Sequence, residues 1–384
     1  MSKLRDFIDK IKPNFEKGGK FSKLQSTFEA FETFAYTPKT VTRTGSHIRD
    51  AVDMKRAMIV VVIALLPALL FGMWNVGYQH ALSLDANAQI SENFWPNFWY
   101  GFLKVLPIIV VSYVVGLAIE FAFAQIRGHE VNEGFLVTGM LIPLIVPVTV
   151  PLWQLALAVA FAVIIGKEAF GGTGMNFINP ALLARAFLFF AYPASISGTG
   201  IWVAEAGDAI TGATPIVDII THSNSAASMM DLFWGFVPGC IGETSIPAIL
   251  IGAVILLVTG IASWRIMLSI LIGSTAMCLT FNAIGGSALA EMPFYQHFLI
   301  GGFAFGTVFM ATDPVTSAQT NIGKWIYGFL IGVMVILIRV KNDAYPEGMM
   351  LAILLMNVFA PLIDYIVVRC NIKKRKRRMQ NAKN

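Results

Sequence analysis

The sequence predicts an all-α integral membrane protein of about ten transmembrane helices, on the basis of its composition, its apolar segments and its basic termini. Of its 384 residues, 56% are hydrophobic and only 13% are charged, which leaves too little polar surface to cover a soluble globule of this size. Lipid must therefore solvate much of the folded chain.

Apolar segments long enough to cross the hydrocarbon layer, which takes roughly 20 residues per helix, begin at residue 57 and recur to the end. The predicted spans are 57–77, 99–125, 134–150, 152–168, 178–195, 246–263, 265–283, 296–312, 324–340 and 348–369. The third, fourth and fifth are short and are interrupted by Pro143, Pro147, Pro151 and Pro180. This pattern is typical of discontinuous helices, whose freed backbone groups must face protein or a cavity.

Basic residues gather at both ends of the chain. Twelve of the 28 Lys and Arg lie in residues 1–56 and eight more in 369–384. An even number of helices puts both termini on one side, which the positive-inside preference makes the cytoplasm. Residues 186–264 contain no Lys or Arg and five acids, so they are predicted to face outward. Lys104, Arg339 and Lys341 are exceptions.

Two pairs of segments are similar to each other: GFLVTGMLIPLIVP to HFLIGGFAFGTVFMATDP, and INPALLARAFLFFAYP to EGMMLAILLMNVFAPL. They predict two inverted five-helix repeats, in which Arg339 mirrors Lys167 on the opposite face; chance similarity between apolar segments is the alternative. The predicted domains are a cytoplasmic N-terminal segment (1–56), the first repeat (57–195), an outward loop (196–245), the second repeat (246–370) and a basic cytoplasmic tail (371–384).

The remaining composition argues against other classes. Cys240, Cys278 and Cys370 lie far apart and form no C-x-x-C pair, so neither a disulfide framework nor a cysteine-ligated metal site is predicted. The N-terminus has no apolar stretch or cleavage site of a signal peptide. The tail KKRKRR, 373–378, is predicted to anchor the chain at the inner face, and nucleic-acid binding is not expected.

Two polar segments can carry chemistry. In DAITGATPIVD, residues 208–218, small neighbours leave the Thr214 hydroxyl open to modification by a phosphoester, although the same string also suits a plain turn. In GGTGMNFINP, residues 171–180, Asn176 and Asn179 can donate hydrogen bonds to the ring system of a ligand or satisfy the backbone of a broken helix. The second segment lacks the G-K-[ST] ending of a phosphate loop.

Acids at membrane depth cost at least ~2.5 kcal/mol each, so each needs a partner or a wet pathway. Glu120, Asp313 and Asp364 are such acids. Carboxylates suit a hard cation such as sodium, whereas helix capping or snorkelling is the alternative. Beside Asp313, Phe305 and Phe309 share a helix face and can form an apolar gate or simply pack.

Longer segments carry a resemblance to a known family. They are GGKFSKLQSTFEAFETFAYTPKTVTRTGSHIRDAVDMKR, HEVNEGFLVT, KEAFGGTGMNFINPALLARAFLFFAYP, DAITGATP, GIASWR, GGFAFGTVFMATDPVTS and NDAYPEGMMLAILLMNVFAPLIDYIVV. Together they resemble the B subunits of sodium-translocating NADH:quinone oxidoreductases over nearly the whole chain. In that family the motif D-x-x-[ST]-G-A-T carries FMN as a phosphoester on its last threonine. The matching residues here are Asp208, Thr211, Gly212, Ala213 and Thr214.

The resemblance implies an enzyme subunit, a translocase component of a six-subunit complex in the bacterial inner membrane. Electrons from NADH would arrive through partner subunits, the C subunit in particular, and pass from covalent FMN at Thr214 to non-covalent riboflavin near Asn176 and Asn179, then to a quinone such as ubiquinone. Sodium export would use Glu120, Asp313, Asp364, Phe305 and Phe309. The flavins carry the redox chemistry, so no metal and no catalytic side chain of the chain itself is expected.

Two alternatives share much of this pattern. The D subunit of the related complex that couples ferredoxin and NAD also carries HIRD and the flavin motif, but GGKFSKL and AYTP ahead of SHIRD, within residues 13–42, favour the B subunit. A flavin-free channel of inverted-repeat type would have the same helix count. Leu117 and Ala118, after Gly116, are bulkier than the glycine-rich quinone region of the family, so the quinone geometry is expected to differ.

Overall fold

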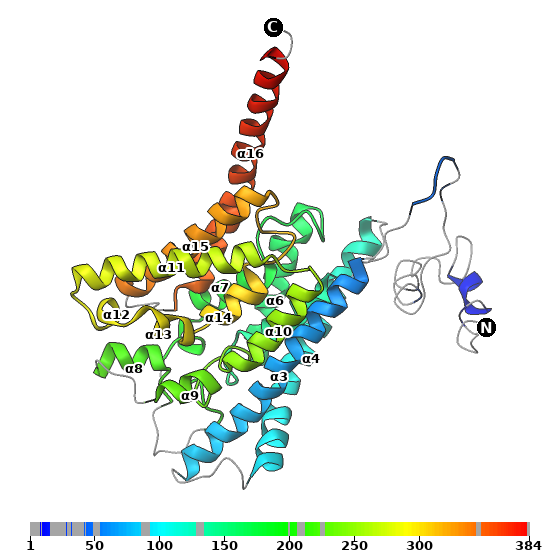
Figure 1. Cartoon of the computed structure of the whole chain (residues 1–384). Helices are drawn as coiled ribbons and strands as arrows, with labels where there is room; N and C mark the ends of the chain where they lie inside the picture. Colours follow the sequence, from blue (N-terminus) through cyan, green and yellow to red (C-terminus); the bar gives the residue numbers. More distant parts are fainter. Residues whose placement is uncertain are drawn as a thin grey trace.

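The structure is a computed structural model of the chain. It describes residues 8, 10–15, 28, 32, 42, 44–48, 54–85, 93–127, 134–198, 200–205, 212–222, 227–342 and 347–381. Throughout these ranges the regular elements are helices, and no strand occurs among them (Figure 1). The predicted all-α membrane class is confirmed. Most of the N-terminal segment 1–56 lies outside the described residues.

Six helices of the described ranges are long and apolar enough to cross a bilayer. They are α3 (Met54–Leu84), α4 (Phe94–Arg127), α6 (Leu152–Gly166) with the following turn η3 (Glu168–Phe170), α11 (Trp264–Ile284), α15 (Asn321–Lys341) and α16 (Met349–Asn381). Three apolar helices are shorter: α5 (Phe135–Leu144), α7 (Pro180–Ala191) and α10 (Ile246–Val258). Each predicted span overlaps helix, but ten full-length spans are not confirmed.

The broken helices follow from proline and glycine. α5 ends at Leu144, before an irregular stretch that contains Pro147 and Pro151, because a residue that precedes proline disfavours helical backbone. The predicted span 296–312 is divided into α13 (Phe294–Leu299), α14 (Phe303–Phe305) and the π-helix η5 (Gly306–Met310). Gly301, at φ +59°, makes the break between α13 and α14. Discontinuous helices therefore occur in both halves of the chain.

The remaining described helices are short. η4 (Pro193–Ser195) lies at the end of the predicted span 178–195, whereas η1 (Lys12–Asn14), α8 (Pro215–His222), α9 (Met229–Trp234) and α12 (Ala288–Glu291) were not predicted from the sequence. α8 and α9 belong to the predicted outward loop 196–245, so this loop carries its own helices.

Some helix contacts of the first half have counterparts in the second. α6 contacts α4 and α7, and α15 likewise contacts α11 and α16, while α3 against α10 and α7 against α16 join the halves. The cation–aromatic contacts repeat as well: Lys167, which follows α6, lies 5.9 Å from the ring centre of Phe135, and Arg339, in the last turn of α15, lies 5.9 Å from that of Phe303. The inverted relation between Lys167 and Arg339 stays a prediction. The exact domain boundaries stay a prediction.

The three basic residues that break the charge rule have local partners. Lys104 lies 2.5 Å from a carboxylate oxygen of Glu205, and hydrogen bonds from Lys104 and Tyr100 hold the pKa of Glu205 below its usual value. Arg339 is 0% exposed and donates to the backbone carbonyls of His297, Ile300 and Glu347. Lys341 lies over the ring of Phe281. Arg339 is thus an internal structural cation rather than a loop charge.

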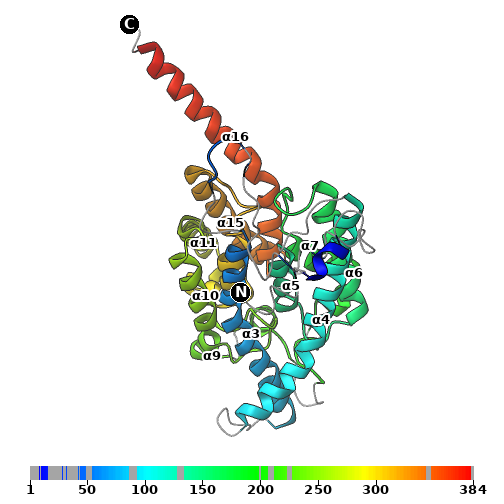
Figure 2. The ribbon, with the colours of Figure 1, turned by 90° about the vertical axis from the view of Figure 1, so that its right-hand side faces the viewer.

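α16 continues well beyond the other helices of the bundle (Figures 1 and 2). Its 33 residues give a length of about 50 Å, whereas the hydrocarbon layer is about 30 Å thick. Every residue of the basic run 373–378, predicted as an anchor, is exposed. Elsewhere, large apolar side chains such as Val114 and Val254 are exposed on the helix surfaces, as lipid contact requires.

Candidate functional site

Two pockets lined by both polar and apolar side chains lie toward different ends of α3. The first, called here the Asp313 cavity, has a volume of about 80 Å³ and includes Met58 of α3 in its wall. The second, called the Thr214 pocket, has a volume of about 30 Å³ and includes Val237, whose carbonyl accepts a hydrogen bond from Asn75 of α3. Asn75 lies 17 residues after Met58 on this helix, so the two pockets lie toward different ends of α3.

Side chains from both halves of the chain line the Asp313 cavity. Its polar residues come from α5, from the segment between α6 and α7, and from the residues after η5; they are Thr138, Lys167, Thr173, Asn176, Asn179, Thr312 and Asp313. Its apolar residues include Val61, Val137, Leu141, Leu256 and Phe309. Three predicted site residues, Asn176, Asn179 and Asp313, are thus brought into one cavity.

Asp313 both caps its own turn and faces this cavity. Its carboxylate accepts hydrogen bonds from the Val315 amide at 3.1 Å and the Thr316 hydroxyl at 2.9 Å. It also accepts one from the Asn179 side-chain amide at 3.3 Å, across the two halves of the chain. Asp313 therefore caps the turn that follows it and also lies in the wall of the cavity.

The two asparagines also serve the backbone. The Asn179 side-chain oxygen accepts hydrogen bonds from Ala181 and Leu182, so Asn179 is the N-cap of α7, and Pro180 occupies the first turn. Asn176 donates to the Ile178 carbonyl. Beside them, the buried Thr173 hydroxyl has no hydrogen-bond partner among the described residues. The cavity therefore retains polar hydrogen-bonding capacity.

Glu120 does not lie in the wall of this cavity. It forms a buried ion pair with Lys167, whose side chain is 3% exposed, as against 4% for Glu120. The neighbouring Glu168 pairs with Arg127 at 3.5 Å. Because a single buried charge is costly, each group compensates the charge of the other, and the pair joins α4 to the end of α6.

Asp364 lies apart from Asp313. Its carboxylate accepts hydrogen bonds from the backbone amides of Gln319 and Thr320 and from the Thr320 hydroxyl, at 2.6, 3.0 and 2.6 Å. Thr320 is the N-cap of α15. A carboxylate at this helix start is stabilised by the helix dipole, so Asp364 ties α16 to α15.

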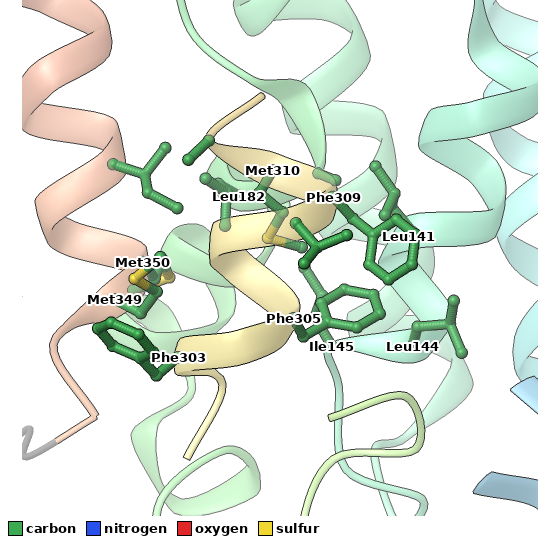
Figure 3. Close-up of a cluster of buried hydrophobic side chains, with 14 of the residues drawn as sticks. Leu141, Leu144, Ile145, Leu182, Phe303, Phe305, Phe309, Met310, Met349 and Met350 are labelled. Atoms are coloured by element: carbon green, nitrogen blue, oxygen red, sulfur yellow. The ribbon is translucent and has the colours of Figure 1, made fainter. Parts of the chain in front are cut away.

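An apolar plug separates the two pockets. Phe305 and Phe309 are buried, with ring centroids 5.0 Å apart, and point from α14 and η5 toward α5 (Figure 3). Leu141, Leu144 and Ile145 meet them there, while Phe303 points to the other side, toward Met349. A π-helix is rare and often occurs at functional sites. Here it carries the predicted gate residue Phe309.

The described part of the flavin motif, Gly212 to Thr214, leads into α8. Asp208 and Thr211 lie outside the described residues. Thr214 is half-buried, its carbonyl accepts a hydrogen bond from the Asp218 amide at 3.0 Å, and Pro215 begins the helix. The Thr214 pocket is also lined by Ile216, Cys240, Glu243, Thr244, Ile300, Gly301 and Glu347. A larger hollow of about 740 Å³, between α8, α9, α12 and α13, shares Leu232 and Ile300 with it.

An ion network in the Thr214 pocket was missed from the sequence. Arg185 of α7 donates to Glu243 at 2.7 Å and also forms an ion pair with Glu347. The side chains of Arg185, Glu243 and Glu347 are 5%, 8% and 16% exposed. Burial raises the pKa of the Glu243 carboxyl, and the Arg185 guanidinium opposes this rise. A lone Arg inside the predicted span 178–195 was a usable signal.

The site contains no evident metal centre: within the ranges that the structure describes, no group of three His, Cys, Asp or Glu is placed to hold a metal ion. Its polar groups suit hydrogen bonding to an organic ligand and contact with a hard cation.

Comparison with known proteins places the chain in a family. It is 50% identical to the B subunit of the Na(+)-translocating NADH-quinone reductase of Ectopseudomonas mendocina, over 97% of this chain and 98% of that protein. The corresponding B subunits of Stutzerimonas stutzeri (51%, over 97% and 98%) and Chromohalobacter salexigens (49%, over 98% and 96%) are similarly close. The model of the NQR2, RnfD, RnfE family matches residues 41–373, so the chain belongs to this family.

Proposed function

We propose that this chain is the flavin-carrying B subunit of a sodium-translocating NADH:quinone reductase. It works in the bacterial inner membrane with both termini in the cytoplasm, and it assembles with the C subunit and the other members of the complex. It passes electrons to a quinone and couples this transfer to sodium export. The observation that carries the proposal is the G-A-T motif ending in Thr214 at the wall of a buried pocket, in a chain about half identical to such B subunits over nearly its whole length.

The residues around Thr214 fit a covalently held FMN. Gly212 and Ala213 are small, and Thr214 precedes Pro215 at the start of α8, where the partial positive charge of the helix favours a phosphate group. The adjoining hollow of about 740 Å³ offers room for a ring system. FMN bound here supplies one-electron transfer. Thr214 fixes its position, and the outward loop leaves it within reach of the C subunit.

The residues of the Asp313 cavity fit a second flavin, riboflavin. Asn176, Asn179 and the unpartnered Thr173 hydroxyl offer hydrogen bonds, and Val137 and Leu141 offer apolar contact. A volume of about 80 Å³ holds several water molecules, so binding a flavin ring requires the lining side chains to open. Residues 145–151 and 171–179, which are not continuous helix, are suited to such a change.

The same arrangement supports passage of a cation. Asp313 offers carboxylate oxygens on one side of the Phe305–Phe309 plug, and the Thr214 pocket offers them on the other. A pump must keep its two sides from being open together, and an apolar constriction between two polar pockets meets this requirement. Glu120 and Asp364 hold the helices around this path through the contacts described above.

Asp313→Asn is expected to weaken the stimulation of turnover by sodium, because the amide removes the charge that attracts the cation but keeps the side-chain shape. The measurement is NADH-driven quinone reduction against sodium concentration in the purified complex. Asp231→Asn, at the capping box of α9, is the matched control and should retain the sodium response. Unchanged stimulation in Asp313→Asn would show that this carboxylate is only structural.

Mass spectrometry of the chymotryptic peptide that contains Thr214 tests the covalent flavin. The expected mass is that of the peptide plus FMN minus one water, as a phosphoester requires. An unmodified Thr214 in a colourless protein would overturn the proposal and favour a flavin-free channel. A modified Thr214 together with partners of a ferredoxin-linked complex would instead identify the chain as the D subunit of that complex, so the co-purifying subunits are identified in the same experiment.

A further inference from the structure

The Thr214 pocket contains carboxylates that could bind a cation, and a buried arginine already pairs with both of them. Two carboxylates, Glu243 and Glu347, are held by the single guanidinium of Arg185. These groups come from different parts of the fold: α7, the loop before α10, and the residue two positions before α16. Since all three side chains are largely buried, water neutralises them poorly and their charges must balance within the protein.

A fourth side chain points to a missing ligand. Thr244, next to Glu243, is 7% exposed, and its hydroxyl has no hydrogen-bond partner among the described residues. Burying a hydroxyl without a hydrogen-bond partner is unfavourable, so a native protein rarely keeps one without a use. It lines the same pocket as the two carboxylates. Three oxygen-bearing side chains thus face one space of about 30 Å³, which is enough for a small ion or one or two water molecules.

The pocket lies directly behind the apolar plug. A methyl group placed on Gly242 would lie 3.1 Å from the Phe305 ring, so the loop that carries Glu243 packs against the plug residue. A methyl group on Gly302, just before α14, would lie 2.6 Å from a Glu243 carboxylate oxygen. Any shift of α14 and η5 that moves Phe305 would therefore also move the surroundings of Glu243.

Among the residues that the structure describes, the charges around the pocket cancel. Arg185 forms ion pairs with Glu243 and Glu347. The Arg339 guanidinium donates to backbone carbonyls, one of which is that of Glu347. Two cations and two anions leave no net charge for an additional ion. A sodium ion can occupy the carboxylates only while Arg185 withdraws from them, and the return of Arg185 would expel it.

We propose that Glu243, Glu347 and Thr244 form a release site for the transported monovalent cation on the Thr214 side of the plug, and that Arg185 is the internal cation that displaces it. This inference rests on the proposed function as a sodium pump. Two carboxylates and a hydroxyl are the hard oxygen ligands that such an ion prefers. Arg185 keeps the site at low affinity, as release against an outside sodium concentration requires.

The test uses the complete complex in proteoliposomes with an uncoupler and valinomycin, so that no membrane potential opposes turnover. NADH added outside selects complexes whose Thr214 side faces the lumen. Initial quinone reduction is measured with lumenal NaCl increasingly replacing choline chloride. In Arg185→Gln the two carboxylates lose their competing cation. The lumenal sodium concentration at which turnover falls to half is therefore expected to be about tenfold lower than in the unmodified protein. Arg185→Lys, which keeps the charge, should stay close to the unmodified protein.

Thr244→Val is the second variant and is independent of the ion network. It removes one oxygen ligand while keeping the side-chain shape, so lumenal sodium should inhibit about threefold more weakly, and Thr244→Ser should restore the inhibition. Lys104→Gln is the control, because Lys104 pairs with Glu205 on an exposed surface outside the pocket. If Arg185→Gln fails to assemble, the Thr244 variants decide.

The inference is overturned if the complex pumps sodium but neither Arg185→Gln nor Thr244→Val changes the lumenal sodium dependence. A complex that reduces quinone without moving sodium would instead refute the proposed function, and that is measured separately as sodium uptake into the same vesicles.

Discussion

Thr214→Val is expected to abolish the in-gel flavin fluorescence of this subunit and to stop quinone reduction. Valine has nearly the same shape as threonine but no hydroxyl, so no phosphoester can form, and electrons no longer have a carrier at this position. NADH oxidation by artificial acceptors should continue, because it depends on the partner subunits alone. Fluorescence of the subunit in a denaturing gel and both activities of the purified complex are the measurements.

Thr221→Val is the matched control for this change. Thr221 lies on the same helix, α8, and its hydroxyl donates to the carbonyls of Val217 and Asp218. Losing such local hydrogen bonds should leave flavin fluorescence and quinone reduction intact. Fluorescence retained in Thr214→Val would mean that another residue carries the flavin.

Lys167→Met is expected to destabilise the folded subunit by about 3–5 kcal/mol, since it leaves the buried Glu120 without its cation. Glu120 sits on α4 and Lys167 at the end of α6, so the loss should appear as a marked fall in the thermal unfolding midpoint of the purified complex. Because Lys167 also lines the Asp313 cavity, the shape of this cavity should change at the same time.

A double variant separates charge from shape in this pair. Adding Glu120→Gln to Lys167→Met removes the unpaired charge, and most of the lost stability should return, because a neutral pair has no buried ion to compensate. Surface variants such as Lys341→Met should have little effect. A double variant no more stable than Lys167→Met alone would contradict the explanation by charge.

Much of the fold could be predicted from local sequence. The apolar segments locate α3, α4, α11, α15 and α16 because lipid contact demands long apolar runs. The prolines between residues 143 and 180 correctly predict discontinuous helices. The short helices α8, α9 and α12 could not be predicted this way, because they lie between spans and are stabilised by local caps such as the Ser228–Asp231 capping box.

The candidate site was only partly predictable, because its contacts join distant residues. Asn179 and Asp313, which are 134 positions apart, share a hydrogen bond, and Arg185 pairs with residues 58 and 162 positions away. No periodicity in a single sequence encodes such pairings. Glu120, Asp313 and Asp364 were found because each is conspicuous in an apolar segment. Lys167 was not recognised as the partner of Glu120, and the network of Arg185, Glu243 and Glu347 was missed.

The long C-terminal extension of α16 has a practical consequence for following motion in this protein. Cys240 and Cys278 are buried, while Cys370 is exposed on α16. A maleimide dye or nitroxide should therefore attach to the unaltered subunit at a single thiol. Because a continuous helix transmits rotation of its base to its tip, the attached reporter would register tilting of α16 during turnover without any engineered cysteine.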